Sequence, residues 1–166
     1  MSDTAQLPEL SAHTREVIDA WRAKFPEGRQ RSAVIAALHA VQHENQGYME
    51  AAHMNAVAEY LELPTIQVYE VATFYSMFQT RKCGRNEVSI CTNVSCMLRG
   101  SDAIVAHVES KLGIKLGEST ADGRIFLKRE EECIAACCGA PAMQVNHQYV
   151  ENLTPEIIDD ILDGLE

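Results

Sequence analysis

The sequence carries few positive charges for its length. Its 166 residues include 14 Lys and Arg against 24 Asp and Glu, which gives a formal net charge of -10. Binding to the phosphate backbone of nucleic acids depends on cations that displace condensed counterions. The shortage of such cations therefore makes nucleic acid an unexpected partner.

Long apolar runs and glycine-rich phosphate-binding loops are also missing from the sequence. No segment approaches the roughly 18 apolar residues of a membrane-spanning helix, so we expect membrane association only through another subunit. Neither G-x-G-x-x-G nor a P-loop occurs, so no dinucleotide or flavin site is predicted. No nucleophile with a base and an orienting group can be assembled, so we expect no catalytic residues.

The first residues, MSDTAQLPEL, lack the basic segment and apolar stretch of an export signal. A chain of this length with 46% hydrophobic residues can bury a core without covalent cross-links. We therefore expect a cytoplasmic protein whose six cysteines are reduced or metal-bound.

Four of those cysteines form two close pairs. Cys91 and Cys96 bracket four residues, Cys133 and Cys137 bracket three, and 36 residues separate the pairs. Four thiolates suit either Zn²⁺, in a closed tetrahedron, or a [2Fe-2S] cluster, with two thiolates per iron. Zinc knuckles usually have two-residue gaps, so the wider gaps favour the cluster over zinc and over disulfides, while leaving all three open.

The first half of the chain has the apolar periodicity of helices. We expect helices over residues 11–24, 32–46 and 50–61, with a fourth after Pro64. Helical spacing also places Phe74, Tyr75 and Phe78 in the core. Residues 11–78 are thus predicted to form a small helical bundle.

The second half alternates short strands with helices. We expect strands over residues 88–90, 125–127, 142–145 and 148–151, with Asn146 and His147 at the tip of a hairpin. Helices are expected over residues 101–112 and after Thr154, which would act as N-cap. The predicted fold class is α+β: a helical domain, residues 1–80, followed by a domain with a small mixed sheet, residues 81–166.

Several segments together resemble one known family. The chain is similar to the thioredoxin-like [2Fe-2S] ferredoxins that serve as a subunit, designated E, of respiratory NADH:quinone oxidoreductase (complex I). The segments that carry the resemblance are HENQGYM (43–49), VATFYSMF (71–78), ICTNVSCMLRG (90–100), LGIKLGESTADGRIFL (112–127), ECIAACCGAPAM (132–143) and NLTPEIIDDIL (152–162). They span nearly the whole chain after its first ten residues.

This resemblance implies a thioredoxin-like fold for residues 81–166 and one [2Fe-2S] cluster. The ligands it implies are Cys91, Cys96, Cys133 and Cys137. It also implies a flavin- and NADH-binding partner subunit that holds FMN and NAD, further peripheral-arm subunits, and a position peripheral to the inner membrane. The isolated chain is then an electron carrier that does not oxidise NADH unaided, and residues 11–78 provide much of the docking surface.

The second cysteine motif departs from the family pattern. The family commonly has a Leu-Gly pair between the two cysteines, where this chain has Ile134 and Ala135, and Cys138 is an additional cysteine. Adjacent side chains point in different directions, so we expect Cys138 to be a spectator. Cys83 lies among basic residues that can lower a thiol pKa, but an inert loop thiol is expected.

Three other functions fit parts of the pattern. A structural zinc module would use the same four cysteines. A thiol oxidoreductase would use Cys137 with Cys138 or Cys91 with Cys96, although the chain lacks a C-x-x-C motif at these positions. The homologous iron-sulfur subunit of an NAD-linked formate dehydrogenase or hydrogenase would show the same residues, and only its partner subunits would distinguish it.

Overall fold

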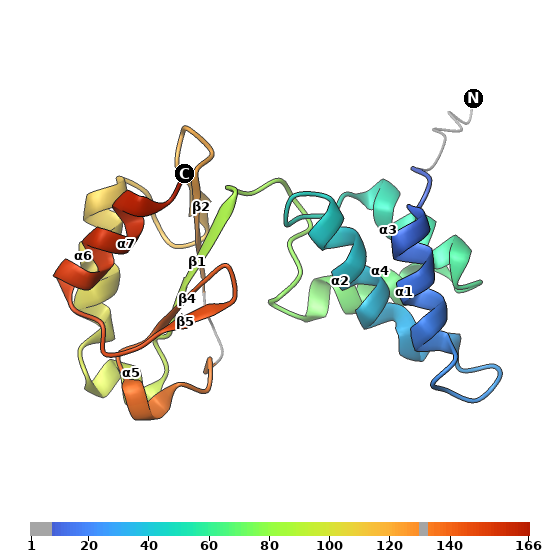
Figure 1. The fold of residues 1–166 in the computed structure, drawn as a ribbon, viewed down its shortest axis with the longest axis horizontal. Coiled ribbons are helices and arrows are strands. Elements are labelled where there is room, and N and C mark those ends of the chain that lie inside the picture. The colour runs from blue at the N-terminus through green and yellow to red at the C-terminus, as the bar shows by residue number, and fades with distance from the viewer. Residues whose placement is uncertain (1–7, 130–132) are drawn as a thin grey trace. The chain divides into compact units, whose positions relative to one another are not determined.

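The computed structural model describes residues 8–129 and 133–166. The chain divides into two compact units, Met1–Lys82 and Cys83–Glu166, each with its own hydrophobic core. The described residues contain seven α-helices and a five-stranded mixed sheet, which confirms the α+β class (Figure 1). None of the helices in these residues is long and apolar enough to cross a membrane.

The first unit is the expected helical bundle. Its helices pack around one apolar core to which Leu38, Val57 and Val68 contribute fully buried side chains. The elements are α1 (Ala12–Arg22), a 3-10 helix (Gln30–Ala33), α2 (Val34–Glu44), α3 (Ala51–Tyr60) and α4 (Thr65–Phe74).

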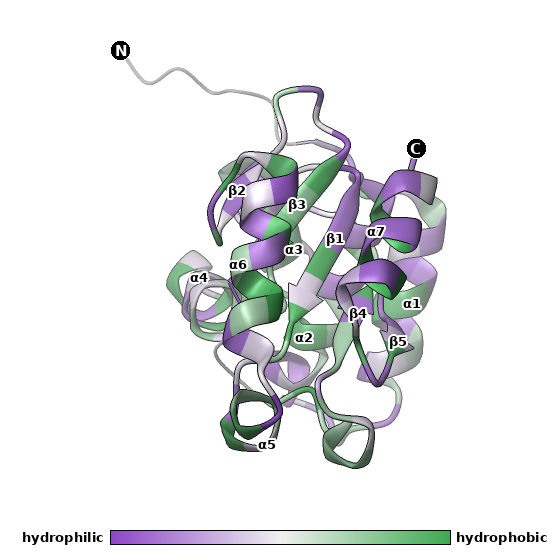
Figure 2. Cartoon of the chain, turned by 90° about the vertical axis from the view of Figure 1, so that its left-hand side faces the viewer, coloured by the Kyte–Doolittle hydropathy of each residue, from purple (hydrophilic) through white to green (hydrophobic). Residues whose placement is uncertain are grey.

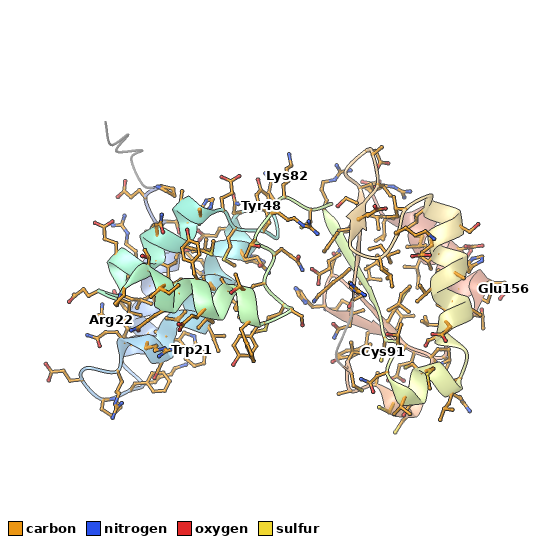
Figure 3. The ribbon with its side chains drawn as sticks, turned by 180° about the vertical axis from the view of Figure 1, so that it is seen from behind. Trp21, Arg22, Tyr48, Lys82, Cys91 and Glu156 are labelled. Atoms are coloured by element: carbon orange, nitrogen blue, oxygen red, sulfur yellow. The ribbon has the colours of Figure 1, made fainter. Side chains whose placement is uncertain are left out.

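A carboxylate on α2 fixes the start of α1. Ser11 is the N-cap of α1, and its hydroxyl oxygen accepts the Thr14 N–H at 2.9 Å. The Ser11 and Thr14 hydroxyls in turn donate to the two Glu44 carboxylate oxygens at 2.7 and 2.8 Å. These hydrogen bonds hold the pKa of Glu44 below its usual value. At the other end of α1, Lys24 Nζ lies 3.6 Å from the centroid of Trp21, which Figure 3 labels.

The aromatic segment after α4 differs from expectation. The prediction that Phe74 and Tyr75 are core residues is wrong, because their exposed fractions are 79% and 38%. Helix α4 ends at Phe74 and Tyr75 has extended backbone, so the helical spacing used for the prediction does not continue to Phe78. Phe78 is buried as expected and joins the core. The helical unit therefore exposes apolar surface that its own core does not cover.

The second unit combines a small sheet with three helices. Its strand order is β2-β3-β1-β4-β5, in which β1 and β3 are parallel and the other pairs antiparallel. A parallel pair needs a crossover, which α5 and α6 supply between β1 and β3. The elements are β1 (Asn86–Ile90), α5 (Val94–Leu98), α6 (Ser101–Leu112), β2 (Glu118–Ser119), β3 (Ile125–Lys128), β4 (Met143–Val145), β5 (Gln148–Val150) and α7 (Pro155–Gly164).

Two helices form one layer against this sheet. Figure 1 shows α6 and α7 beside the same face of the strands, and in Figure 2 this layer faces the viewer. Val108 of α6 and Leu162 of α7 are fully buried in one core with Ile90 and Leu127 of the strands. The two helices expected in this half of the sequence therefore both pack on the sheet.

The local turns follow the predicted chemistry in part. Asn146 and His147 have φ values of 48° and 67°, the left-handed pair that a tight hairpin between β4 and β5 requires. The Thr154 hydroxyl accepts the Ile157 N–H at 3.3 Å as the N-cap of α7. Sequence reasoning missed α5 and β2, which are five and two residues long.

Candidate metal centre

The first cysteine pair lies on regular structure. Cys91 directly follows β1, and its N–H donates to the Ala142 carbonyl at 3.1 Å. Cys96 lies within α5, whose N-cap residue Asn93 accepts the Val94 N–H on its side chain at 2.9 Å. Only 1% of Cys91 and 2% of Cys96 are exposed. Both thiols are thus almost fully covered by the surrounding structure.

The second cysteine pair lies on the segment between β3 and β4, of which residues 130–132 are outside the described part. Cys137 opens a 3-10 turn, Cys137–Gly139. The Cys133 and Cys137 sulfurs are 3.4 Å apart, and both residues are exposed. Two thiols at this separation face a common point on the surface.

The fold brings the two motifs to one end of the sheet. Antiparallel pairing of Ile90 with Met143 places the start of β4 beside the end of β1. Figure 1 shows α5 and the Cys137–Gly139 turn at the same end of the unit, and Figure 3 shows Cys91 there. Small and apolar residues cluster with the buried thiols, namely Ile134, Ala136, Ala140 and Ala142.

The thiols influence one another across the two motifs. Burial raises the pKa of Cys96, and the neighbouring Cys91 thiol raises it further. The pKa of Cys133 is lowered, first by the Ala135 N–H and then by Cys137. Cys133 in turn raises the pKa of Cys137, and Cys91 acts in the same direction. The Cys91 thiol thus influences one cysteine of each motif.

Ala135 has an unusual backbone conformation. Its φ is 63°, in the left-handed region that suits glycine, and its N–H donates to Cys133 Sγ at 3.4 Å. Amide hydrogen bonds to a thiolate stabilise its negative charge. Ala135 is the residue that stands where the family commonly has glycine, so the family pattern and the observed φ agree on what this position requires.

The donor set fits an iron-sulfur cluster. Thiolates are the ligands of [2Fe-2S] cores, which take two sulfurs per iron, and this site offers two pairs. Within residues 8–129 and 133–166, however, no three His, Cys, Asp or Glu side chains are grouped closely enough to hold a metal ion, so the structure does not bring the four thiols to one point.

Comparisons with known proteins decide the family. The sequence profile described as "Thioredoxin-like [2Fe-2S] ferredoxin" matches residues 18–166. The chain belongs to the thioredoxin-like [2Fe-2S] ferredoxin family. It is 43% identical over 142 residues to the NADH-quinone oxidoreductase subunit designated E of Rickettsia bellii, covering 86% of this chain and 84% of that protein. It is 42% identical over 150 residues to the corresponding subunit of Rhizobium meliloti, designated E 2, covering 90% and 87%.

Solved structures of one hydrogenase share the fold of this chain. NAD⁺-reducing [NiFe]-hydrogenase in its air-oxidised state matches with a TM-score of 0.65 at 25% identity over 76% of this chain. Its H2-reduced state matches with a TM-score of 0.66. This chain spans only 22% of the hydrogenase chain, so it corresponds to one part of a longer polypeptide.

Membership of the family fixes the cofactor and the general role. The cofactor of a thioredoxin-like [2Fe-2S] ferredoxin is a [2Fe-2S] cluster, as predicted from the sequence. The relatives are named as subunits of an oxidoreductase. The chain is accordingly an iron-sulfur electron-transfer subunit that works with other subunits of an NADH-oxidising complex.

The two remaining cysteines lie differently. Cys138 follows Cys137 in the exposed turn. Cys83 is partly buried, and burial followed by the Glu87 carboxylate raises its pKa. A raised pKa leaves less of the nucleophilic thiolate, so this shift argues against a reactive Cys83.

Proposed function

We propose that this chain carries one [2Fe-2S] cluster in the NADH-oxidising module of NADH:quinone oxidoreductase. The observation that supports the proposal is that the two cysteine motifs, one buried and one exposed, lie at the same end of the sheet. Identity of about 40% to several subunits of NADH-quinone oxidoreductase supports the choice of complex. The chain would lie in the cytoplasm, peripheral to the inner membrane through that complex.

The proposed ligands are Cys91, Cys96, Cys133 and Cys137. A bound cluster supplies the capacity to accept and release one electron. The protein's own contribution is to exclude water from the Cys91 and Cys96 side and to leave the Cys133 and Cys137 side open. Electron exchange with another subunit would then take place at the open side.

The proposed partner is the flavin- and NADH-binding subunit, which would hold FMN and NAD, and other peripheral-arm subunits would complete the module. This sequence has no glycine-rich dinucleotide motif, so the hydride chemistry belongs elsewhere. The helical unit supports a docking role because 63% of Ile66 and 79% of Phe74 on α4 are exposed. Apolar side chains of this size are usually covered in a stable assembly.

A two-domain organisation is part of the proposal. We propose a helical docking domain, residues 1–80, and a cluster domain, residues 81–166. The break between the compact units after Lys82 supports a boundary in this region.

The redox behaviour of the isolated chain tests the proposal. Dithionite should bleach the visible absorption and produce the EPR signal of a reduced [2Fe-2S] cluster, whereas NADH should do neither. Adding the flavin- and NADH-binding subunit should make NADH effective. Rapid reduction by NADH in a preparation free of flavoprotein would contradict the proposed division of labour.

Two single substitutions, each placing a negative charge on one unit, test the docking role. Phe74→Glu should weaken co-purification with the flavin-binding partner, because a carboxylate would be buried in an apolar contact. Tyr149→Glu is the matched control, since Tyr149 is 55% exposed but lies on β5 of the other unit. Wild-type binding by Phe74→Glu would show that α4 is not the docking surface.

A second candidate function rests on the hydrogenase similarity. The chain would then be the iron-sulfur subunit of an NAD-linked hydrogenase or formate dehydrogenase. The 25% identity to the hydrogenase is well below the 43% to the Rickettsia bellii protein, which favours the quinone-linked complex. Mass spectrometry of subunits that co-purify with the tagged chain distinguishes the two.

A further inference from the structure

One side-chain hydrogen bond joins the two cysteine motifs. Arg99 Nε donates to the Ala140 carbonyl at 3.2 Å. Arg99 is the C-cap of α5, three residues after Cys96, and its own N–H donates to the Cys96 carbonyl at 3.0 Å. Ala140 lies three residues after Cys137 and is 3% exposed. The contact therefore runs from the helix that carries one thiol to the turn that carries another.

Among the described residues, a hydrogen bond between the Ser95 and Cys137 side chains also joins the two motifs. The Cys91 N–H donates to the Ala142 carbonyl at 3.1 Å, which holds the far end of the turn. Within the turn, the Ala140 N–H donates to the Cys137 carbonyl at a longer 3.4 Å. Without the guanidinium, the partly buried Ala140 carbonyl would lose its charged donor, and such losses are costly.

The charge of Arg99 also matters for a cluster held at this site. The guanidinium Nε donates to the carbonyl that lies three residues after Cys137, and Arg99 itself follows Cys96 by three residues, so the cation lies beside both motifs. Arg99 is exposed, so added salt screens its charge. A nearby cation stabilises an anionic centre, and stabilises it more once an electron has been added.

We propose that Arg99 is a positioning residue that holds the second cysteine motif against the first and raises the reduction potential of the bound cluster. This proposal rests on the proposed function, because it assumes that both motifs ligate one cluster. Two substitutions distinguish the effect of the Arg99 hydrogen bond from the effect of the Arg99 charge. Lysine keeps the charge but not the planar donor geometry, whereas glutamine loses the charge.

Two variants of the full chain, Arg99→Lys and Arg99→Gln, test the proposal. The rate of cluster loss to an iron chelator is followed by visible absorbance, and the potential by EPR-monitored redox titration. Arg99→Gln should lose its cluster about fivefold to tenfold faster than wild type, the effect of one lost hydrogen bond of ordinary strength. Its potential should be lower, by an amount that shrinks as salt is added. Arg99→Lys should lose the cluster at an intermediate rate with a potential close to wild type.

Arg124→Gln is the matched control. Arg124 also donates to carbonyls, those of Leu162 and Leu165 at 2.8 Å, but at the end of α7. Its loss should lower thermal stability and leave both the chelation rate and the potential unchanged. Wild-type rates and potentials in both Arg99 variants would overturn the proposal, as would an equal effect of Arg124→Gln. If Arg99→Gln fails to fold, the chelation rate of Arg99→Lys decides alone. A wild-type chain that holds no cluster would instead overturn the proposed function, and this inference with it.

Discussion

The two cysteine pairs are positioned by different kinds of structure. Cys91 and Cys96 lie at the end of the central strand and within a helix, and both are buried. Cys133 and Cys137 lie on a connecting segment, and both are exposed. One half of the site is therefore built into the core, and the other half is attached to it.

This difference follows from the topology. Strand β1 has neighbours on both sides, β3 and β4, so the residue that follows it has little freedom. The second pair depends on turn contacts such as the Asn152 N–H donating to the Gly139 carbonyl at 2.6 Å. A centre that is covered on one side and open on the other suits electron exchange, because a partner can approach the open side while water is excluded from the other.

Cysteine substitutions should have the largest effects. Any one of Cys91, Cys96, Cys133 and Cys137 changed to Ala should lose the cluster, measured by iron content, visible absorption and EPR. Cys83→Ala and Cys138→Ala should keep the cluster.

The stability of the cluster-free chain should distinguish the buried pair from the exposed pair. Cys91→Ser should lower the free energy of unfolding by about 1–2 kcal/mol, because it buries a hydroxyl.

Cys133→Ser provides the comparison on the exposed side. Its hydroxyl stays in water, so the cluster-free chain should lose less than about 0.5 kcal/mol. Chemical denaturation measures both values. Equal destabilisation by Cys91→Ser and Cys133→Ser would contradict the distinction between a buried first cysteine pair and an exposed second pair.

Substitutions at two glycines compare the backbone packing beside β1 with that of the second cysteine motif. A Cβ at Gly84, just before β1, would lie 2.5 Å from the Ile125 backbone carbon. Backbone cannot move aside cheaply, so Gly84→Ala should cost about 2–3 kcal/mol of unfolding free energy. A Cβ at Gly139 would meet the Glu151 carboxyl group, which can reorient, and the Glu151 Cβ at 2.5 Å, which cannot, so Gly139→Ala should cost about 2 kcal/mol, somewhat less than Gly84→Ala.

Gly164→Ala is the control for both glycine variants. A Cβ there meets nothing within 4 Å, so the change should be neutral or slightly stabilising. Thermal and urea unfolding give the ranking. A larger cost for Gly139→Ala than for Gly84→Ala would mean that the second motif is the more rigid one.

A change in the helical unit tests whether the cluster site depends on it. The Ser11 hydroxyl, then that of Thr14, lowers the pKa of Glu44 below its unfolded value of about 4.3. The ionised carboxylate therefore stabilises the fold above that pH, and this contribution is lost as pH falls through the folded pKa. Glu44→Gln should cost about 0.5–1 kcal/mol at pH 7, since the carboxylate is solvent-exposed.

Thermal unfolding of Glu44→Gln is measured from pH 7 down to pH 3. The difference in stability from wild type should disappear at the acidic end of this range. Glu16→Gln, a change at a carboxylate on α1, should show no comparable difference at pH 7. The EPR signal of the bound cluster should be unchanged in both. An altered signal in Glu44→Gln would contradict the proposed assignment of the cluster to residues 81–166 alone.

Ala135→Gly should have the smallest effect. Glycine removes the cost of a left-handed φ but adds backbone freedom to the unfolded chain, so a net gain of about 0.5 kcal/mol is expected. The N–H donor to Cys133 is retained, so the visible spectrum should not change. Calorimetry of the cluster-free chain is the measurement, and clear destabilisation would show that the Ala135 methyl group makes a contact that the second motif needs.

Sequence reasoning reached the fold class and most elements because they leave periodic patterns. Helix α6 has the predicted bounds, residues 101–112, and the hairpin at Asn146 has the predicted turn. Helix α5 was missed because its five residues are too few to show a helical period. Phe74 was misplaced because helical spacing does not reveal where a helix ends.

For the site, spacing identified the two cysteine pairs, and the resemblance supplied the cluster and its ligands. The unequal burial of the pairs depends on the order of strands in the sheet, which local sequence does not show. The Arg99 contact with Ala140 joins residues 41 positions apart and is likewise a tertiary property.

The central claim is that Cys91, Cys96, Cys133 and Cys137 together hold one [2Fe-2S] cluster. The most direct measurement is iron, zinc and acid-labile sulfide analysis of the anaerobically purified chain, with the EPR spectrum after dithionite reduction, for wild type and Cys133→Ala. The account predicts about two irons and two sulfides per wild-type chain with a reduced-cluster signal, and loss of both in Cys133→Ala. Zinc in place of iron, or a stable wild-type spectrum from Cys133→Ala that persists when Cys138 is also changed to Ala, would contradict it.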